Sequence, residues 1–173
     1  MSLQVLSKVS SIIDRFIDGL GRFIAWFTVL MVVVMTVIVL LRYGFSIGWI
    51  AMQESVIYMH ACVFMLGAAY TLAKDEHVRV DIFYQKFSAK QKALVDLMGT
   101  LLCLLPVFGF LFYYSFEYVV SSWQLMEKSP EAGGIPAVYL LKSLLLVMPT
   151  LMILQGFALA IKYVLVLAEK ESN

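Results

Sequence analysis

One stretch of the sequence, residues 55–73, constrains the fold more than any other. It holds 19 consecutive residues without Asp, Glu, Lys or Arg, with Glu54 before it and a charged patch, residues 74–81, after it. At the rise of an α-helix these residues extend about 28 Å, close to the roughly 30 Å hydrocarbon core of a bilayer. We therefore expect this segment to cross a membrane as a helix.

Three further segments have the same character. Uncharged runs of 19, 20 and 19 residues occupy positions 23–41, 97–116 and 143–161. The chain is 62% hydrophobic and 14% charged, whereas soluble domains are about 45–50% apolar and about 25% charged. The sequence predicts an all-α, polytopic membrane protein that forms a single membrane domain over residues 1–173. The four transmembrane helices are expected at about 22–44, 50–74, 92–122 and 138–166.

Two shorter helices are expected at the membrane surface. In residues 3–20, apolar side chains recur at helical spacing with polar ones between them, which is typical of an amphipathic helix lying in the interface. The connector between the second and third spans is expected to hold a short interfacial helix, with Ser88 as the N-cap of the helix that follows. The first apolar run lacks a small-residue cleavage site, so we expect the N-terminal segment to be retained.

The distribution of Lys and Arg predicts the orientation. Ten of these 13 residues lie in the N-terminal segment, the connector between the second and third spans, and the C-terminal tail. Because basic residues concentrate on the cytoplasmic side, both termini are expected in the cytoplasm. The net charge of +1 provides no basic field, so no nucleic-acid partner is expected.

Ionisable residues inside a membrane mark pathways for ions and substrates. In the four uncharged runs the only such residue, apart from Cys and Tyr, is His60. We therefore do not expect the chain to transport a substrate alone. We also expect no enzymatic activity and no metal or cofactor in this chain.

One face of the second span combines polar and small residues. Gln53, His60, Gly67 and Lys74 recur at intervals of seven, so they share one side of the helix. One interpretation is a seam against another protein helix. The other is that His60 is a core histidine bonded to a neighbouring span.

Two features at the ends of this span also have alternative interpretations. Arg42 and Glu54, on either side of the first turn, either form a charge pair or reach the interface independently. The second feature is the patch at residues 74–81, which includes His77 and Asp81. Its individual charges are interpreted as the solvated flank of the span.

Several motifs, in their order, resemble those of one transporter family. The second span ends in LGAAYTL (residues 66–72), EHVRVD follows it (residues 76–81), and Glu54 lies 13 residues before Gly67. A loop with Ser-Pro and Gly-Gly-Ile-Pro at residues 127–136, then Lys142 and Leu-Gln-Gly at residues 154–156, complete the set. The chain from about residue 23 to 162 is similar to the small membrane subunit of tripartite ATP-independent periplasmic (TRAP) transporters, of DctQ type.

The resemblance implies a scaffold in the bacterial inner (cytoplasmic) membrane. Its partners would be a large TRAP membrane subunit, a periplasmic substrate-binding protein, and lipids at the subunit interface. The large subunit would carry the sodium and substrate sites and move as an elevator, and the substrates would be small organic acids (carboxylates). Gln53 stands where the family often has an acid, so the resemblance does not extend to a role that needs two carboxylates there.

The resemblance and the residue pattern together predict two groups of site residues. Those at the partner interface or with a structural role are Arg42, Gln53, Glu54, His60, Gly67, Lys74, His77 and Asp81. Those in the periplasmic loop, expected to face the binding protein, are Glu127, Lys128, Ser129 and Glu131.

Two other functions remain open. The chain can be a haem-binding membrane anchor of a respiratory enzyme, although such a site would need a second buried histidine besides His60. It can also be an accessory subunit of an unrelated membrane complex.

Overall fold

The computed structural model describes residues 2–78 and 84–169, and these residues form helices and connecting turns without a strand. The elements are α1 (Ser2–Phe45), α2 (Ile50–Ala73), the 3₁₀ turn η1 (Tyr84–Lys86), α3 (Ala89–Gly99), the π-helical turn η2 (Thr100–Leu104), α4 (Leu105–Gln124) and α5 (Val138–Glu169). Four stretches of the described chain are long and apolar enough to cross a membrane: Gln4–Phe45, Ile50–Ala73, Ala89–Gln124 and Val138–Ala168. The predicted all-α fold with four spans is therefore confirmed.

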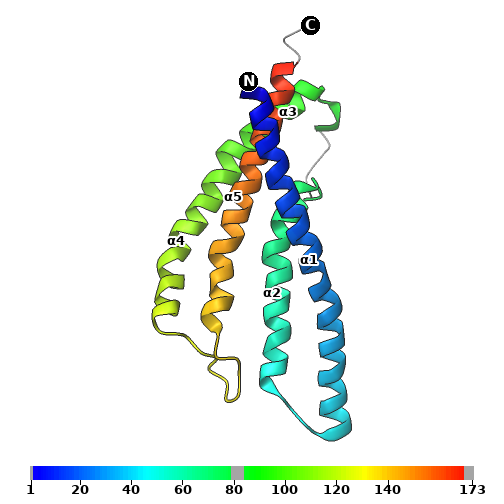
Figure 1. Cartoon of the computed structure of the whole chain (residues 1–173), viewed down its shortest axis with the longest axis vertical. Helices are drawn as coiled ribbons and strands as arrows, with labels where there is room; N and C mark the ends of the chain where they lie inside the picture. Colours follow the sequence, from blue (N-terminus) through cyan, green and yellow to red (C-terminus); the bar gives the residue numbers. More distant parts are fainter. Residues whose placement is uncertain (1, 79–83, 170–173) are drawn as a thin grey trace.

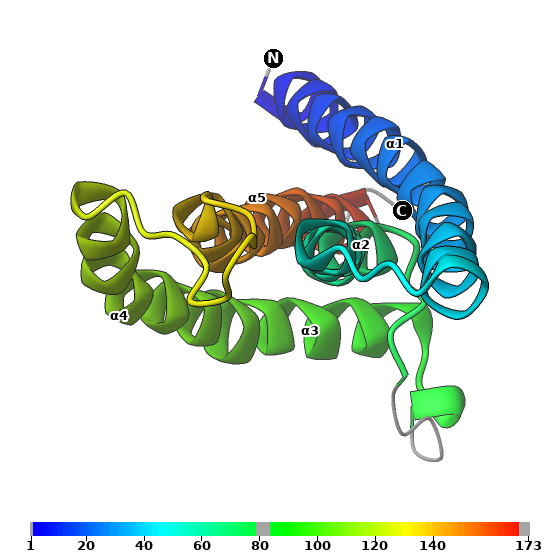
Figure 2. The same ribbon diagram turned by 90° about the horizontal axis from the view of Figure 1, so that it is seen from below.

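At the outer end the spans stand in a row. Along this row α1 packs on α2, α2 on α5, and α5 on α4, and Figure 2 shows the order from below. Toward the inner end α1 also packs on α5. The start of α1 and the end of α5 lie together at one end of the molecule (Figure 1), which we call the inner end. The opposite end, with the α1–α2 turn and the α4–α5 loop, is the outer end. In the most apolar part of α5, 44% of the residues are buried, against 6% in the corresponding part of each other span. The central helix of the described chain is therefore α5.

The buried core lies toward the inner end, where three helices meet. Ile17 of α1 and Ala69 of α2 pack with Leu151 and Met152 of α5. Gly21 permits this close approach, because a Cβ added there would collide with the ring of Tyr70. The first turns of α1 are therefore packed against protein.

This packing explains why the N-terminal interfacial helix is not confirmed. Residues 3–20 are helical, but they continue without a break into the first span as one helix of 44 residues. Such a helix is about 66 Å long, roughly twice the hydrocarbon core of a bilayer. Part of its amphipathic stripe is buried inside the protein, as Ile17 at 1% exposure shows. Apolar periodicity identifies a helix with one apolar face, and protein can cover that face as well as lipid.

The interfacial helix predicted in the connector is not confirmed either. The described part of the connector contains the single turn η1, and residues 79–83, with Asp81 among them, lie outside the described residues. The predicted N-cap is present. The hydroxyl of Ser88 accepts the backbone N–H of Gln91, and the Gln91 side chain accepts the backbone N–H of Ser88. This reciprocal pair is a capping box, which fixes where α3 begins.

Ser88→Ala should weaken the start of α3. The variant leaves the Gln91 backbone N–H without its side-chain acceptor, and the loss of an N-cap costs about 1 kcal/mol. Hydrogen exchange should become several-fold faster at the first amides of α3. Ser7→Ala, at an exposed position inside α1, is the control and should leave exchange in α3 unchanged.

Candidate functional site

Glu54 fastens the loop between α4 and α5 at the outer end. Its Oε1 accepts a hydrogen bond from the hydroxyl of Ser129, and its Oε2 accepts the backbone N–H of Ile135 at 2.6 Å. The N–H of Ser129 donates to the carbonyl of Ile135 at 3.2 Å, which closes the loop on itself. A carboxylate is suited to this position because it is acceptor-only and can take both donors at once.

Two glycines make this attachment possible. Gly133 has a φ of 81°, in the left-handed region where a side chain is disfavoured. Gly134 lies against the bonded group, because a Cβ there would be 2.8 Å from Glu54 Oε1 and closer still to Ser129. The Gly-Gly pair therefore allows the loop backbone to approach the carboxylate of Glu54.

Glu127 joins the same loop to α4 and α5. Its Oε2 accepts the hydroxyl of Ser122 at 2.6 Å and lies 2.6 Å from the ammonium of Lys142. That ammonium is also 4.1 Å from the centroid of the Tyr118 ring. The hydrogen bond from Lys142, followed by that from Ser122, holds the pKa of the Glu127 carboxyl below its ordinary value of 4.5.

The stability of the purified protein should therefore fall in acid. A carboxyl whose pKa is lower in the folded state stabilises the fold above its unfolded pKa, and this contribution is lost as the pH falls through the folded pKa. The melting temperature in detergent should drop between about pH 5 and pH 3, and Glu127→Gln should make the drop smaller. An identical pH profile for wild type and variant would contradict this account.

The other residues predicted at the outer end are placed differently. No ion pair joins Arg42 to Glu54 in the described chain; Arg42 is exposed, and with Gln53 it lines a hollow of about 330 Å³ between α1 and α2. The charge pair considered from the sequence is therefore not formed. In the α4–α5 loop, Lys128 and Glu131 are exposed, whereas Glu127 and Ser129 are used in the bonds that shape the loop.

The middle of α2 exposes a histidine. His60 is the eleventh of the 24 residues of α2, and it has no hydrogen bond to any described residue. The side chains one turn to either side, Ile57 and Phe64, are 58% and 71% exposed. Within this chain the core-histidine interpretation therefore does not hold. The face is open near the depth where a membrane is most apolar.

Gly67 continues the same open face toward the inner end. A Cβ added there would meet nothing within 4 Å. The face of polar and small residues ends at Lys74, whose ammonium pairs with Asp18 of α1 at 2.6 Å. His77 turns back onto α2, with its Nε2 3.2 Å from the carbonyl oxygen of Ala68. We define the docking face as Ile57, His60, Phe64 and Gly67.

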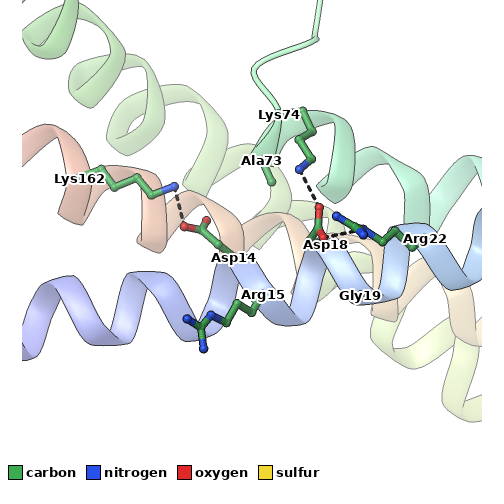
Figure 3. A pocket seen from close by; sticks show the side chains of 8 residues that line it. All are labelled: Asp14, Arg15, Asp18, Gly19, Arg22, Ala73, Lys74 and Lys162. Atoms are coloured by element: carbon green, nitrogen blue, oxygen red, sulfur yellow. Dashed lines mark ion pairs between the residues drawn. The ribbon is translucent and has the colours of Figure 1, made fainter.

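A charge network at the inner end ties α1 to both neighbouring helices (Figure 3). Asp18 pairs with Lys74 at 2.6 Å and with Arg22 at 2.8 Å. Asp14 pairs with Lys162 of α5 at 2.7 Å. The hydrogen bond to Asp18 raises the pKa of the Lys74 ammonium.

This network was not predicted from the sequence, although the sequence contains a signal that points to it. Asp14 also accepts a hydrogen bond from Nε2 of Gln155, which is fully buried in α5 and 141 residues distant. The signal was two aspartates four residues apart, beside Ile13 and Ile17 on a stripe that is otherwise apolar. Acids bordering an apolar stripe are expected to have a partner in the protein.

The four span-capable helices define a multi-pass membrane protein. Residues 31–165 match the family model of the tripartite ATP-independent periplasmic transporters, DctQ component. This match covers most of the chain, which therefore belongs to the DctQ family and is a transporter component and not an enzyme. Membership implies, in general terms, a large membrane subunit and a substrate-binding protein as partners. Searches of curated proteins and of solved structures find no match.

The haem-anchor interpretation receives no support from the histidines. His60 is exposed on the side of a row of helices, and the second histidine of the sequence, His77, contacts the backbone of the same helix. A bis-histidine site would need the two rings to face each other across a buried space.

Proposed function

We propose that this chain is the small scaffold subunit of a sodium-coupled TRAP transporter that takes up small organic acids (carboxylates). In this proposal the large, elevator-type subunit holds the sodium ions and the substrate and moves during transport. The present chain stays fixed in the bacterial inner membrane, with both termini in the cytoplasm. The periplasmic binding protein delivers the substrate.

The observation that carries the proposal is the docking face of α2. A polar side chain left against lipid in mid-membrane is costly, so residues of this kind almost always face protein or water. Among the described residues of its own chain, His60 is exposed and has no hydrogen-bond partner. A helix of the large subunit can supply the hydrogen-bond partner, and Gly67 lets the two backbones approach closely.

The charge networks support a subunit that does not move. Asp14 and Asp18 fasten α1 to α5 and α2 at the inner end, and Glu54 and Glu127 fasten the α4–α5 loop at the outer end. Bonds at both ends of the row resist sliding of one helix past another. A fixed wall of this kind suits the part of a transporter against which a mobile subunit slides.

Two surfaces suit the remaining partners. The exposed side chains of Lys128 and Glu131, at the outer end, are the part of the loop available to a binding protein. An apolar groove of about 600 Å³ between α1 and α2, lined by residues such as Met31, Val39 and Val56, suits lipid tails at the subunit interface.

The test is reconstitution into liposomes with a sodium gradient. We expect uptake of a radiolabelled carboxylate when the large subunit, this chain and the binding protein are present together. A thermal-shift screen of the binding protein selects the carboxylate beforehand. Omission of this chain, or replacement of the sodium gradient by a potassium gradient, should abolish uptake. Uptake by this chain alone would overturn the proposal.

A further inference from the structure

A hollow of about 640 Å³ opens at the inner end between α1, the end of α2 and α5 (Figure 3). The charged residues that line it are Arg15, Arg22, Lys74, Lys162, Asp14 and Asp18. Four cations against two anions leave a formal charge of +2. We propose that this hollow, the basic pocket, binds the phosphate group of an anionic phospholipid. The proposal concerns this chain alone and does not rest on the transport function.

The two aspartates do not neutralise the pocket. Asp14 is paired with Lys162, and Asp18 is shared between Lys74 and Arg22. Arg15 has no carboxylate partner among the described residues, and Figure 3 shows its guanidinium directed away from both ion-paired groups. One complete guanidinium therefore remains available to an anion.

The donors that remain suit a phosphodiester. A guanidinium presents N–H groups in a planar fork that binds two phosphate oxygens at once. Arg22 uses its Nε for Asp18, which leaves its terminal N–H groups, and its side chain is 75% exposed. Arg15 and Arg22 are seven residues apart on α1 and so lie on one side of the helix. Rotation of the Arg15 side chain about its own bonds would bring both guanidinium groups to one phosphate group.

The surroundings of the pocket favour a lipid over a soluble phosphate. Lys74 directly follows α2, and Arg22 stands at the start of the first uncharged run, so both mark the level of the headgroups. Beyond Arg22 the same side of α1 exposes Trp26, Val29 and Val33, at 72%, 54% and 54%. Acyl chains attached to a bound headgroup can lie along this apolar stripe, from which a soluble phosphate would gain nothing.

The expected orientation agrees with this ligand. The positive-inside rule predicts that the inner end is cytoplasmic, where anionic lipids attract basic residues, and basic pockets between spans on that side bind anionic headgroups. A bound lipid would bridge Arg15 and Arg22 of α1 to Lys74 beyond α2. It would thereby add to the contacts that hold these helices together.

The experiment is native mass spectrometry of the delipidated full-length chain in detergent. Phosphatidylglycerol and phosphatidylcholine with the same acyl chains are the probes. We expect the wild type to retain phosphatidylglycerol about tenfold more strongly than phosphatidylcholine. Arg15→Gln should remove most of this preference and Arg15→Lys should keep much of it. Lys90→Gln, at an exposed cation of α3 that does not line the basic pocket, is the matched control and should change nothing.

Arg15 is the informative position because its substitution breaks no ion pair in the described chain, so the fold should survive. Unchanged melting temperature, measured alongside, confirms that each variant is folded. Equal retention of both lipids, or equal loss from Arg15→Gln and Lys90→Gln, would overturn the proposal. So would displacement of the lipid by an equal concentration of inorganic phosphate, which would identify a soluble anion as the ligand.

Discussion

Gly67→Leu should release the large membrane subunit from this chain while the chain itself stays folded. In the part of the chain that the structure describes, no atom lies within 4 Å of a Cβ at this position, so there is room for the larger side chain. In the proposed complex it would separate two closely packed helices and move His60 away from its partner. Overpacking of a close contact costs about 1–3 kcal/mol, so we expect copurification to fall roughly tenfold.

The measurement is the ratio of the two subunits after affinity purification in a mild detergent, together with the melting temperature of the chain alone. Gly109→Leu is the matched control, because Gly109 lies on α4 and a Cβ there also meets nothing within 4 Å. Gly21→Leu gives the opposite pattern, because its side chain collides with Tyr70 and should destabilise the chain itself. If Gly109→Leu released the partner and Gly67→Leu did not, the docking face would lie on α4.

Glu54→Ala should loosen the α4–α5 loop and destabilise the chain. The variant leaves the N–H of Ile135 and the hydroxyl of Ser129 without their acceptor. Hydrogen bonds to a charged group contribute about 1.5–3 kcal/mol, and we expect a loss of about 2 kcal/mol in the free energy of unfolding. Hydrogen exchange at the amide of Ile135 should become at least tenfold faster, and the melting temperature should fall.

Two variants in the same loop separate this effect from a general change of charge. Glu131→Ala removes an exposed carboxylate and should leave exchange at Ile135 unaltered. Gly134→Ala keeps Glu54 but places a methyl group against its carboxylate, and should reproduce the loosened loop. Protection at Ile135 that survives both Glu54→Ala and Gly134→Ala would show that other contacts hold the loop.

The sequence was sufficient for the spans and for the family. Uncharged runs of about 19 residues leave few alternatives to a membrane helix, because the backbone must satisfy its own hydrogen bonds in lipid. The N-cap at Ser88 was also predicted, since a cap depends on bonds within one turn. The motifs from Glu54 to Gly156 carried the resemblance that the match over residues 31–165 confirms.

The residue partners were harder to predict, because they depend on which helices become neighbours. Glu54 finds its donors 75 and 81 residues further along the chain, whereas the nearby Arg42 does not pair with it. The inner network joins Asp14 to Gln155 across 141 residues. The continuity of α1 was missed for a related reason: the stripe around Ile17 is covered by protein, and the sequence does not state what covers it.

The row of helices also determines how the stability of this chain should be understood. In a closed bundle each span shields part of its neighbours. In three of the four spans of the described chain, however, only 6% of the residues in the most apolar part are buried within the chain itself. The exposed part of these spans must be covered by lipid or by another subunit. A subunit that binds the folded state adds stability in proportion to the logarithm of its concentration. The folded lifetime of this chain should therefore depend on how much partner the membrane contains. Copies of the chain in excess of the partner should be degraded faster than copies bound to it.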